Sequence, residues 1–347
     1  MPDSPQGEVM EIISYVARRL ATIIPTLLGA SMVIFVLTML IPGDPALMRL
    51  GNFATAEQLQ SLHEEMGLTK PLYERYMLYL GGLLRGDMGR SWRTGNLVLD
   101  DLRARLPMSI ELGVCSMLLA IAIGIPVGVW SAASKDSVID YSGKAYGILG
   151  VAMPLFWGGL VLVYVFYFKL GIAPAPTGRI DMLVSPPTHI TGSYLLDGLL
   201  TGDLEVVMSS AAHLVLPVIT LAFVTGASIA RMTYTSMRKV LASQFILVSH
   251  AYGVSPRAIV YKFALKNALM PVVTLIGLQV GFLIGGVVLV EVVFSLPGIG
   301  RYAVESLLVN DFAPVQGFVL LVLVVYLLVN LLVDLLYGVL NPQVHNG

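Results

Sequence analysis

Few residues of this chain have types and spacings that could carry out chemistry. The stretch HEEMG begins at His63 but lacks the second histidine of a metalloprotease helix, and no zinc site is visible elsewhere. The stretch YSGKAY, residues 141–146, lacks the first glycine of a phosphate-binding loop, so ATP cannot bind by that route. Cys115 is the lone cysteine, which leaves no disulfide framework. Without a nucleophile or metal cluster, the sequence does not indicate an enzyme.

Several polar and small residues lie inside or beside long apolar runs. Glu291 lies at the end of one run and is a functional candidate, although it can equally reach water or Arg301. Gln279 is the best candidate for a polar residue of a pathway, with an interhelical hydrogen bond as the alternative. Asn330 and Asp334 share a helix face, and we expect a structural role for both. Three glycines at four-residue spacing can serve a partner contact, a pathway or internal packing: Gly277, Gly281 and Gly285.

The elements that hold these residues are predicted to be membrane spans. With 56% apolar and 12% charged residues, the chain could not cover a soluble surface, and its net charge of −1 gives no sign of nucleic-acid binding. A spanning helix needs about 20 apolar residues to cross roughly 30 Å of hydrocarbon. The apolar runs are continuous rather than alternating, which predicts an all-α bundle and not a β-barrel. Six spans are expected, at residues 20–41, 112–134, 145–168, 206–230, 271–292 and 315–340.

The distribution of basic residues predicts the orientation of the spans. Lysine and arginine collect on the side that holds both chain ends, the loop after the second span and residues 231–270. The short loops on the other side carry only Lys169, Arg179 and Arg301. By the positive-inside rule, the tails 1–19 and 341–347 and the segment 231–270 are cytoplasmic. Residues 42–111, 171–205 and 293–314 are then extracytoplasmic.

The first extracytoplasmic loop is predicted to fold into a small helical domain. Thr55 and Gln58 have the spacing of a capping box, and Gly67 is a plausible stop for the helix that follows it. Pro71 suits the first turn of a second helix.

Residues 231–270 contain six basic residues and no acidic one. We expect the preceding span to continue as a helix to about Leu241, followed by a short helix, a sharp turn and another helix. The signals for these elements are, in order, Ser243 as a cap, Gln244 to Tyr252 as the short helix, Gly253 as a left-handed stop, and Ser255 with Pro256 as the next start. The short helix is expected to expose four apolar residues, which predicts a covering partner: Phe245, Ile246, Val248 and Tyr252.

Five stretches together resemble one known family. FILVSHAYGVSPRAIVYKFALKNALMPVVTLIGLQ, starting at Phe245, resembles the EAA loop in permease subunits of ABC importers, specifically the dipeptide/oligopeptide branch and its B-type subunit. The others, in chain order, are IPGDPA, LYLGGLLRGDMGRSW, PPTHITGSYLLDGLLTGD and VEVVFSLPGIGRYAVESLLVNDFAPVQG. One departure is that the family's Glu-Ala-Ala falls on Leu247, Val248 and Ser249, which leaves the polar contact to the ATPase unassigned.

The resemblance implies a multi-pass protein of the bacterial inner membrane with a type I permease bundle. It implies a second homologous permease in a heterodimer, two ATPase subunits that bind ATP and Mg²⁺, an external binding protein, a peptide substrate and surrounding lipid. No cofactor is expected in this chain, which is itself non-catalytic. The residues that it implies for contact with the ATPases are Gln244, Phe245, Ile246, Val248, Ser249, His250, Ala251, Tyr252 and Gly253.

Two alternatives remain open. Nickel, opines, glutathione or another small solute could be the cargo, because this branch shares its motifs. An ATP-independent secondary transporter or channel would belong to a different class. Such a protein would typically carry more ionisable residues in its spans or an inverted repeat, and the sequence has neither.

Overall fold

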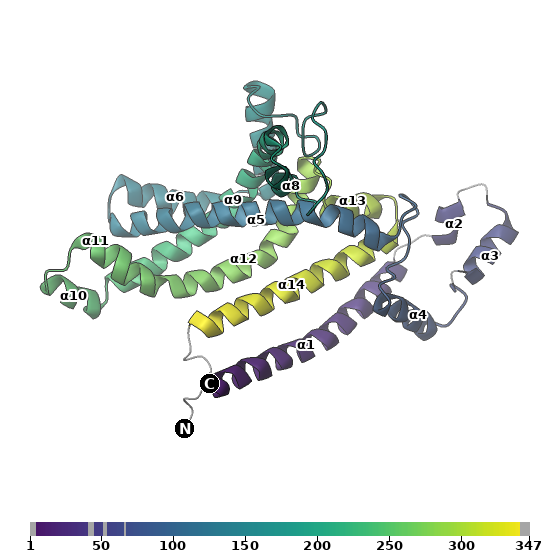
Figure 1. The fold of residues 1–347 in the computed structure, drawn as a ribbon, viewed down its shortest axis with the longest axis horizontal. Coiled ribbons are helices and arrows are strands. Elements are labelled where there is room, and N and C mark those ends of the chain that lie inside the picture. The colour runs from purple at the N-terminus through teal and green to yellow at the C-terminus, as the bar shows by residue number, and fades with distance from the viewer. Residues whose placement is uncertain (1–4, 41–44, 51–53, 66, 341–347) are drawn as a thin grey trace. The chain divides into compact units, whose positions relative to one another are not determined.

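The computed structural model describes residues 5–40, 45–50, 54–65 and 67–340. The chain divides into two compact units, Met1–Arg105 with Tyr302–Gly347 as unit 1 and Leu106–Arg301 as unit 2. Within the described residues every regular element is a helix, and the only β-pairing is an isolated bridge between Arg90 and Leu97. The predicted all-α class is confirmed (Figure 1).

Unit 1 begins with α1 (Pro5–Leu40), α2 (Pro45–Leu50), α3 (Ala56–Glu65) and α4 (Leu72–Leu84), and it ends with α14 (Phe312–Leu340). Two helices run from one unit into the other, α5 (Val98–Ala133) and α13 (Ile299–Leu308). The elements of unit 2 are α6 (Val138–Ala152), α7 (Leu155–Leu162), the π-helix η1 (Val163–Lys169), α8 (Tyr194–Thr201), α9 (Leu204–Leu241), α10 (Gln244–Ala251), α11 (Pro256–Ala258), the π-helix η2 (Ile259–Ala264) and α12 (Leu265–Val293).

Five of the described helical stretches are long and apolar enough to cross a membrane: Thr22–Met39, Val98–Ala133, Leu204–Leu241, Pro256–Val293 and Phe312–Leu331. The segment predicted as the third span, residues 145–168, is not one straight helix. There α6 meets α7 and η1 at a bend of 106°. Pro154 has no backbone N–H to continue the helix and forces the preceding residue, Met153, into extended backbone (φ −79°, ψ 123°). The third span is therefore at most a broken one.

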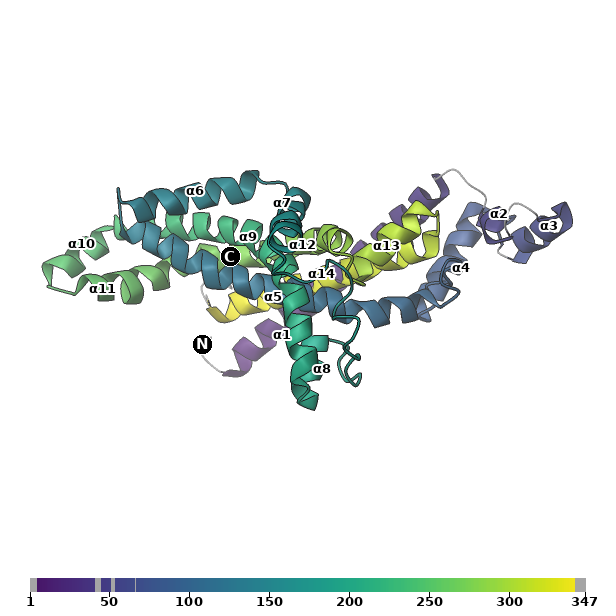
Figure 2. The same cartoon turned by 90° about the horizontal axis from the view of Figure 1, so that it is seen from above.

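Helix α9 is the central element of unit 2. It continues without interruption from Leu204 to Leu241, as the sequence predicts, and α6, α7, α8 and α12 all pack against it. Figures 1 and 2 show α5, α6 and α9 running side by side. Small residues allow this close approach. A methyl group on Gly124 or Gly128 of α5, or on Gly150 of α6, would overlap α9.

The start and end of α3 follow the predicted signals, whereas the start of α4 differs by one position. Thr55 and Gln58 form a reciprocal capping box, in which each backbone N–H donates to the other side chain at 3.0 and 3.3 Å. Gly67 has φ +65° and ends α3. Pro71 lies one position before α4, not in its first turn as predicted. Helix α4 packs on α1 through Tyr76 and Tyr79, which contact the ring of Phe35.

Candidate functional site

The sequence places its main functional candidate at α10, and the structure forms a helix, a tight turn and a second helix there. Gly253 follows α10 with φ +73°, the left-handed conformation predicted for it. The Ser255 hydroxyl accepts a hydrogen bond from the backbone N–H of Ala258, and Pro256 occupies the first turn of α11. Ser243 stands at the start of α10, but its side chain makes no capping bond and its buried hydroxyl oxygen has no partner. The predicted cap contact of Ser243 is therefore wrong.

One face of α10 is apolar and exposed. Leu247 is 71% exposed, and Phe245, Val248 and Tyr252 are also exposed. The prediction that Ile246 is exposed is wrong, because only 2% of that residue is accessible. Sequence reasoning also omitted Leu247 from the exposed residues, although its spacing of three from Gln244 and four from Ala251 places all three on one side of the helix.

Ile246 anchors α10 to the helices of unit 2. Its side chain packs in a buried cluster with residues of four other elements: Val129 and Ala132 of α5, Met237 of α9, Ile259 and Ala264 of η2, and Ala268 of α12. Phe245 adds an edge-on contact to Phe263, with ring centroids 6.1 Å apart. Because protein interiors are close-packed, a displacement of α10 must move these packed helices or break the cluster.

The remaining predicted contact residues lie around the same turn. Gln244, His250 and Ala251 are exposed, as is Gly253. The Ser249 hydroxyl is bonded to the carbonyl of Phe245 at 2.9 Å within the helix, so its donor is used locally. Within the described residues, no group of three or more His, Cys, Asp or Glu could hold a metal ion.

The glycines predicted to share one face of α12 differ in exposure. Gly277 is buried, Gly281 is half-buried and Gly285 is exposed, with no atom within 4 Å of where its Cβ would be. A four-residue step advances about 40° beyond a full turn of 3.6 residues, so the three glycines wind toward the surface. Gln279 is half-buried beside them. The exposed apolar residues nearest to Gly285 along this stripe are Leu278, Phe282 and Leu289.

Glu291, the ionisable candidate of α12, is fully buried and binds α13. One carboxylate oxygen accepts the backbone N–H groups of Gly300 and Arg301 at 2.8 and 3.0 Å, and the other accepts the Ser109 hydroxyl of α5. Glu291 thus accepts from the backbone of Arg301, and one nitrogen of the Arg301 guanidinium donates to the Ser295 carbonyl. The geometry is that of a carboxylate at a helix N-terminus.

Asn330 of α14 is half-buried. The side chain of Asp334, its predicted neighbour on the helix face, lies outside the described side chains.

Comparison with known proteins places these elements in a family. The family model described as "Binding-protein-dependent transport system inner membrane component" matches residues 124–346, which include α9, α10 and α12. A second model, "Binding-prot-dependent transport system membrane comp, N-term", matches residues 12–113.

Three curated relatives align over nearly their whole length. The dipeptide transport system permease protein DppB of Escherichia coli (strain K12) is 38% identical over 338 residues, 96% of this chain and 99% of the relative. The probable D,D-dipeptide transport system permease protein DdpB of the same organism is 41% identical over 319 residues, 92% and 94% of the two chains. The glutathione transport system permease protein GsiC of Pectobacterium atrosepticum is 34% identical over 333 residues, 96% and 99% of the two chains.

Together, the two family models match both the apolar helices and the segment around α10. The chain therefore belongs to the family of binding-protein-dependent transport system inner membrane components, and it is a multi-pass membrane permease of that family.

Proposed function

We propose that this chain is a non-catalytic permease subunit of an ABC importer that carries dipeptides and longer peptides. The observation that supports the substrate class most directly is the near full-length similarity to two dipeptide permeases, at 38% and 41% identity. Glutathione is the second candidate cargo, because GsiC aligns over the same length at 34% identity. A substrate-binding protein would deliver the cargo on the extracytoplasmic side.

The proposed contact with the two ATPase subunits is the exposed face of α10. These subunits would bind ATP and Mg²⁺, and ATP-driven changes in their spacing would push on Leu247, Val248 and Tyr252. Ile246 would transmit the displacement into the cluster that joins α5, α9, η2 and α12. A partner shifts a conformational equilibrium only by binding its states differently. The ATPases would therefore favour inward-open or outward-open bundles according to the position of α10.

The proposed orientation places α10 and both chain ends in the cytoplasm. Support comes from residues 231–270, which carry six basic residues and no acidic one, beside apolar spans. Basic residues in short loops are favoured on the cytoplasmic side, where they also meet anionic lipid.

The proposed second permease subunit would pack on the exposed face of α12 around Gly285. A glycine with open space above it permits close backbone approach of another helix, which is how helices associate in lipid. Leu278, Phe282 and Leu289 would supply the packing around it.

The substrate test is uptake in cells with and without this chain, in a background free of redundant importers. We expect labelled dipeptides and longer peptides to enter only when the chain is present. Labelled glutathione and Ni²⁺ serve as separate arms. Unchanged peptide uptake on deletion, with loss of uptake of either of the other two, would replace the peptide assignment.

The coupling test uses variants of the α10 turn. Gly253→Pro and Ala251→Glu are expected to abolish import while the protein remains in the membrane, because the first cannot adopt φ +73° and the second places a charge in the proposed interface. Arg257→Gln, on exposed α11 beyond the turn, is the control. Normal import by both turn variants would exclude α10 as the coupling element.

A further inference from the structure

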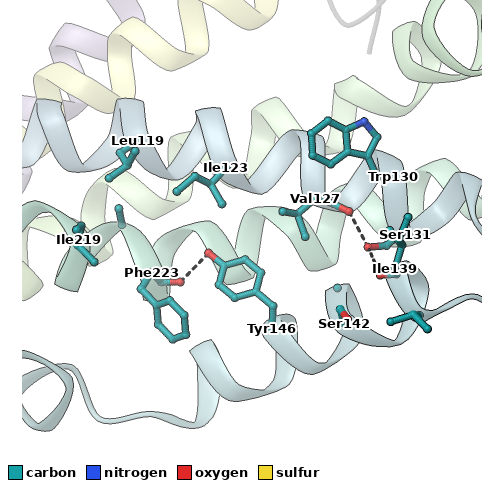
Figure 3. A pocket seen from close by; sticks show the side chains of 13 residues that line it. Leu119, Ile123, Val127, Trp130, Ser131, Ile139, Ser142, Tyr146, Ile219 and Phe223 are labelled. Atoms are coloured by element: carbon teal, nitrogen blue, oxygen red, sulfur yellow. Dashed lines mark hydrogen bonds between the residues drawn. The ribbon is translucent and has the colours of Figure 1, made fainter. Parts of the chain in front are cut away.

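A groove on the surface of unit 2 runs between α5, α6 and α9 (Figure 3). Its volume is about 520 Å³, and its walls are large apolar side chains. Leu119, Ile123 and Val127 lie one turn apart along α5, and Ile219 and Phe223 face them from α9. Along the α6 wall, Tyr146 donates a hydrogen bond to the Phe223 carbonyl at 3.0 Å, which leaves its hydroxyl satisfied and its ring facing the groove.

The groove is poorly suited to a second helix. Helices associate in lipid by placing small residues at the contact. Some of the small residues here are already used internally, since a methyl group on Gly143 would overlap Ser131, and one on Gly150 would overlap Ala227. Most of the groove lining is branched or aromatic, although Ser131, Ser142, Gly143 and Ala222 also contribute to it. A flexible chain without side groups fits such a groove better than a helix does, and it gains dispersion contacts along its whole length.

One end of the groove has the features of a membrane–water interface. Ser131 and Val138, which line this end, flank the turn that joins α5 to α6. Trp130 is at the same end, and its indole N–H donates to the Tyr261 hydroxyl at 3.1 Å. Tryptophan and tyrosine are enriched at the level of lipid headgroups, where one part of the ring is apolar and another is polar.

The charged side chains at this end of the groove lie on or beside the turn from α5 to α6. Asp140 is buried and accepts from Lys144 at 2.9 Å and from the backbone N–H of Asp136. Lys135 and Asp136 are exposed on the turn, with Lys135 Nζ 3.9 Å from the Asp136 carboxylate. Lys135 does not line the groove, but it lies three positions before Val138, which does. A long, exposed ammonium at this end of an apolar groove complements a phosphate attached to an apolar chain.

We propose that the groove is a lipid site, in which one acyl chain of a bilayer phospholipid lies along α5, α6 and α9 and the phosphate is held by Lys135. The bound chain would fill the surface next to Tyr146 and fix the spacing of α6 from α9. The test of this site reads lipid binding and not transport. A wrong substrate assignment and a wrong lipid site are therefore distinguishable.

The test is photo-labelling of the intact transporter complex, reconstituted in phosphatidylethanolamine vesicles with a trace of phosphatidylethanolamine that carries a diazirine on one acyl chain. Label should concentrate on peptides from residues 119–127 and 139–146. Ile123→Trp and, independently, Ile219→Trp fill the groove from two different helices and should each reduce that label severalfold. Leu118→Trp is the matched control, because Leu118 is exposed on the same helix and outside the groove lining.

The headgroup contact is tested with two further arms. Lys135→Glu should lower the groove label with the phospholipid probe, and a diacylglycerol probe without a phosphate should label the groove weakly in the unchanged protein. Equal labelling by the two probes would overturn the assignment of the phosphate to Lys135. Uniform labelling of all exposed helices, or cross-links from position 123 to another protein subunit in native membranes, would overturn the lipid site itself.

Discussion

Glu291 and Ser109 tie three helices of the fold together at one buried point. The carboxylate satisfies two N–H groups at the start of α13 and the hydroxyl of Ser109, which in turn accepts the backbone N–H of Ile299. A buried carboxylate without such partners would be strongly unfavourable, so the loop before α13 must keep this geometry. Gly298 of that loop lies directly against the carboxylate.

Replacing Gly298 by alanine should therefore destabilise the protein. The added methyl group would overlap the Glu291 carboxylate, and overpacking of this kind costs about 1–3 kcal/mol. We expect a lower midpoint of thermal unfolding for the purified complex. Gly81→Ala is the matched control, since nothing lies within 4 Å of its Cβ position and alanine favours a helix. Equal midpoints for the Gly298→Ala protein and the unchanged protein would contradict this geometry.

Asp197 organises the loop before α8 through its charge. Its carboxylate accepts four hydrogen bonds from the backbone N–H groups of residues 190–192 and the Thr191 hydroxyl. Burial alone would raise the pKa of Asp197, but the hydrogen bonds from Thr191, Ile190 and Gly192 outweigh it and hold the pKa at about 2. Because this pKa lies below the value of about 3.9 for an unfolded aspartate, the charged form favours the folded loop.

The loop should therefore lose stability in acid. Its stabilisation by Asp197 is fully present above about pH 4 and is lost as the pH falls toward 2. At pH 4, pepsin should cleave the unchanged protein within residues 182–196 more slowly than it cleaves the Asp197→Asn variant. Near pH 2, the cleavage rate of the unchanged protein should approach that of the variant. A ratio that does not change between these pH values would show that the charge does not hold the loop.

At the scale of elements, α10 shows what sequence reasoning could and could not predict. The residues that begin and end it, Gly253 above all, are local signals, because a left-handed conformation strongly favours glycine. The direction of Ile246 is not local. It depends on a cluster made by residues more than a hundred positions away, such as Val129, and the sequence pattern of apolar residues all round the helix did not reveal it.

Ile246 and Leu247 should separate the structural and the coupling roles of α10. Ile246→Ala opens a cavity in the buried cluster and should cost about 2–5 kcal/mol of local stability, seen as faster amide hydrogen exchange in α10. Leu247→Ala should leave that exchange unchanged but weaken binding of the ATPase subunits about tenfold, the effect of a lost contact worth about 1.4 kcal/mol. The reverse pattern would mean that the two residues have exchanged roles.

The bend between α6 and α7 also depends on packing at the scale of elements. Apolar runs are reliable evidence for spans, since a helix in lipid must satisfy its own backbone. Whether a proline inside a run kinks or breaks the helix depends on whether neighbouring helices hold the two parts at an angle. Gly158 and Gly159 of α7 follow directly, and a methyl group on Gly159 would crowd Phe294 and Val293. This packing accompanies the 106° bend between α6 and α7, and no local sequence signal predicts it.

At the scale of the whole molecule, the spans are buried very unequally. In the most apolar window of α9, 61% of the residues are buried, compared with 28% for the stretch that ends in α12 and 17% for those of α1 and α14. Lipid can cover apolar side chains, but it does not explain an open glycine such as Gly285, because small residues in spans serve close helix contacts. The composition predicted a membrane bundle, whereas the exposure of Gly285 on the face proposed for a partner is visible only in the three-dimensional structure.

Assembly with a second permease is therefore expected to fail when this face is blocked. Gly285→Leu adds a bulky side chain where the chain itself has open space, so its own fold and membrane insertion should be unaffected. The variant should co-purify with much less of the partner permease than the unchanged protein does, when both subunits are expressed together. Gly81→Leu makes the same change at an open glycine of α4, outside the predicted spans, and should pair normally. If both variants retain the partner equally, the face around Gly285 is covered by lipid, and the subunit contact must be sought on another helix.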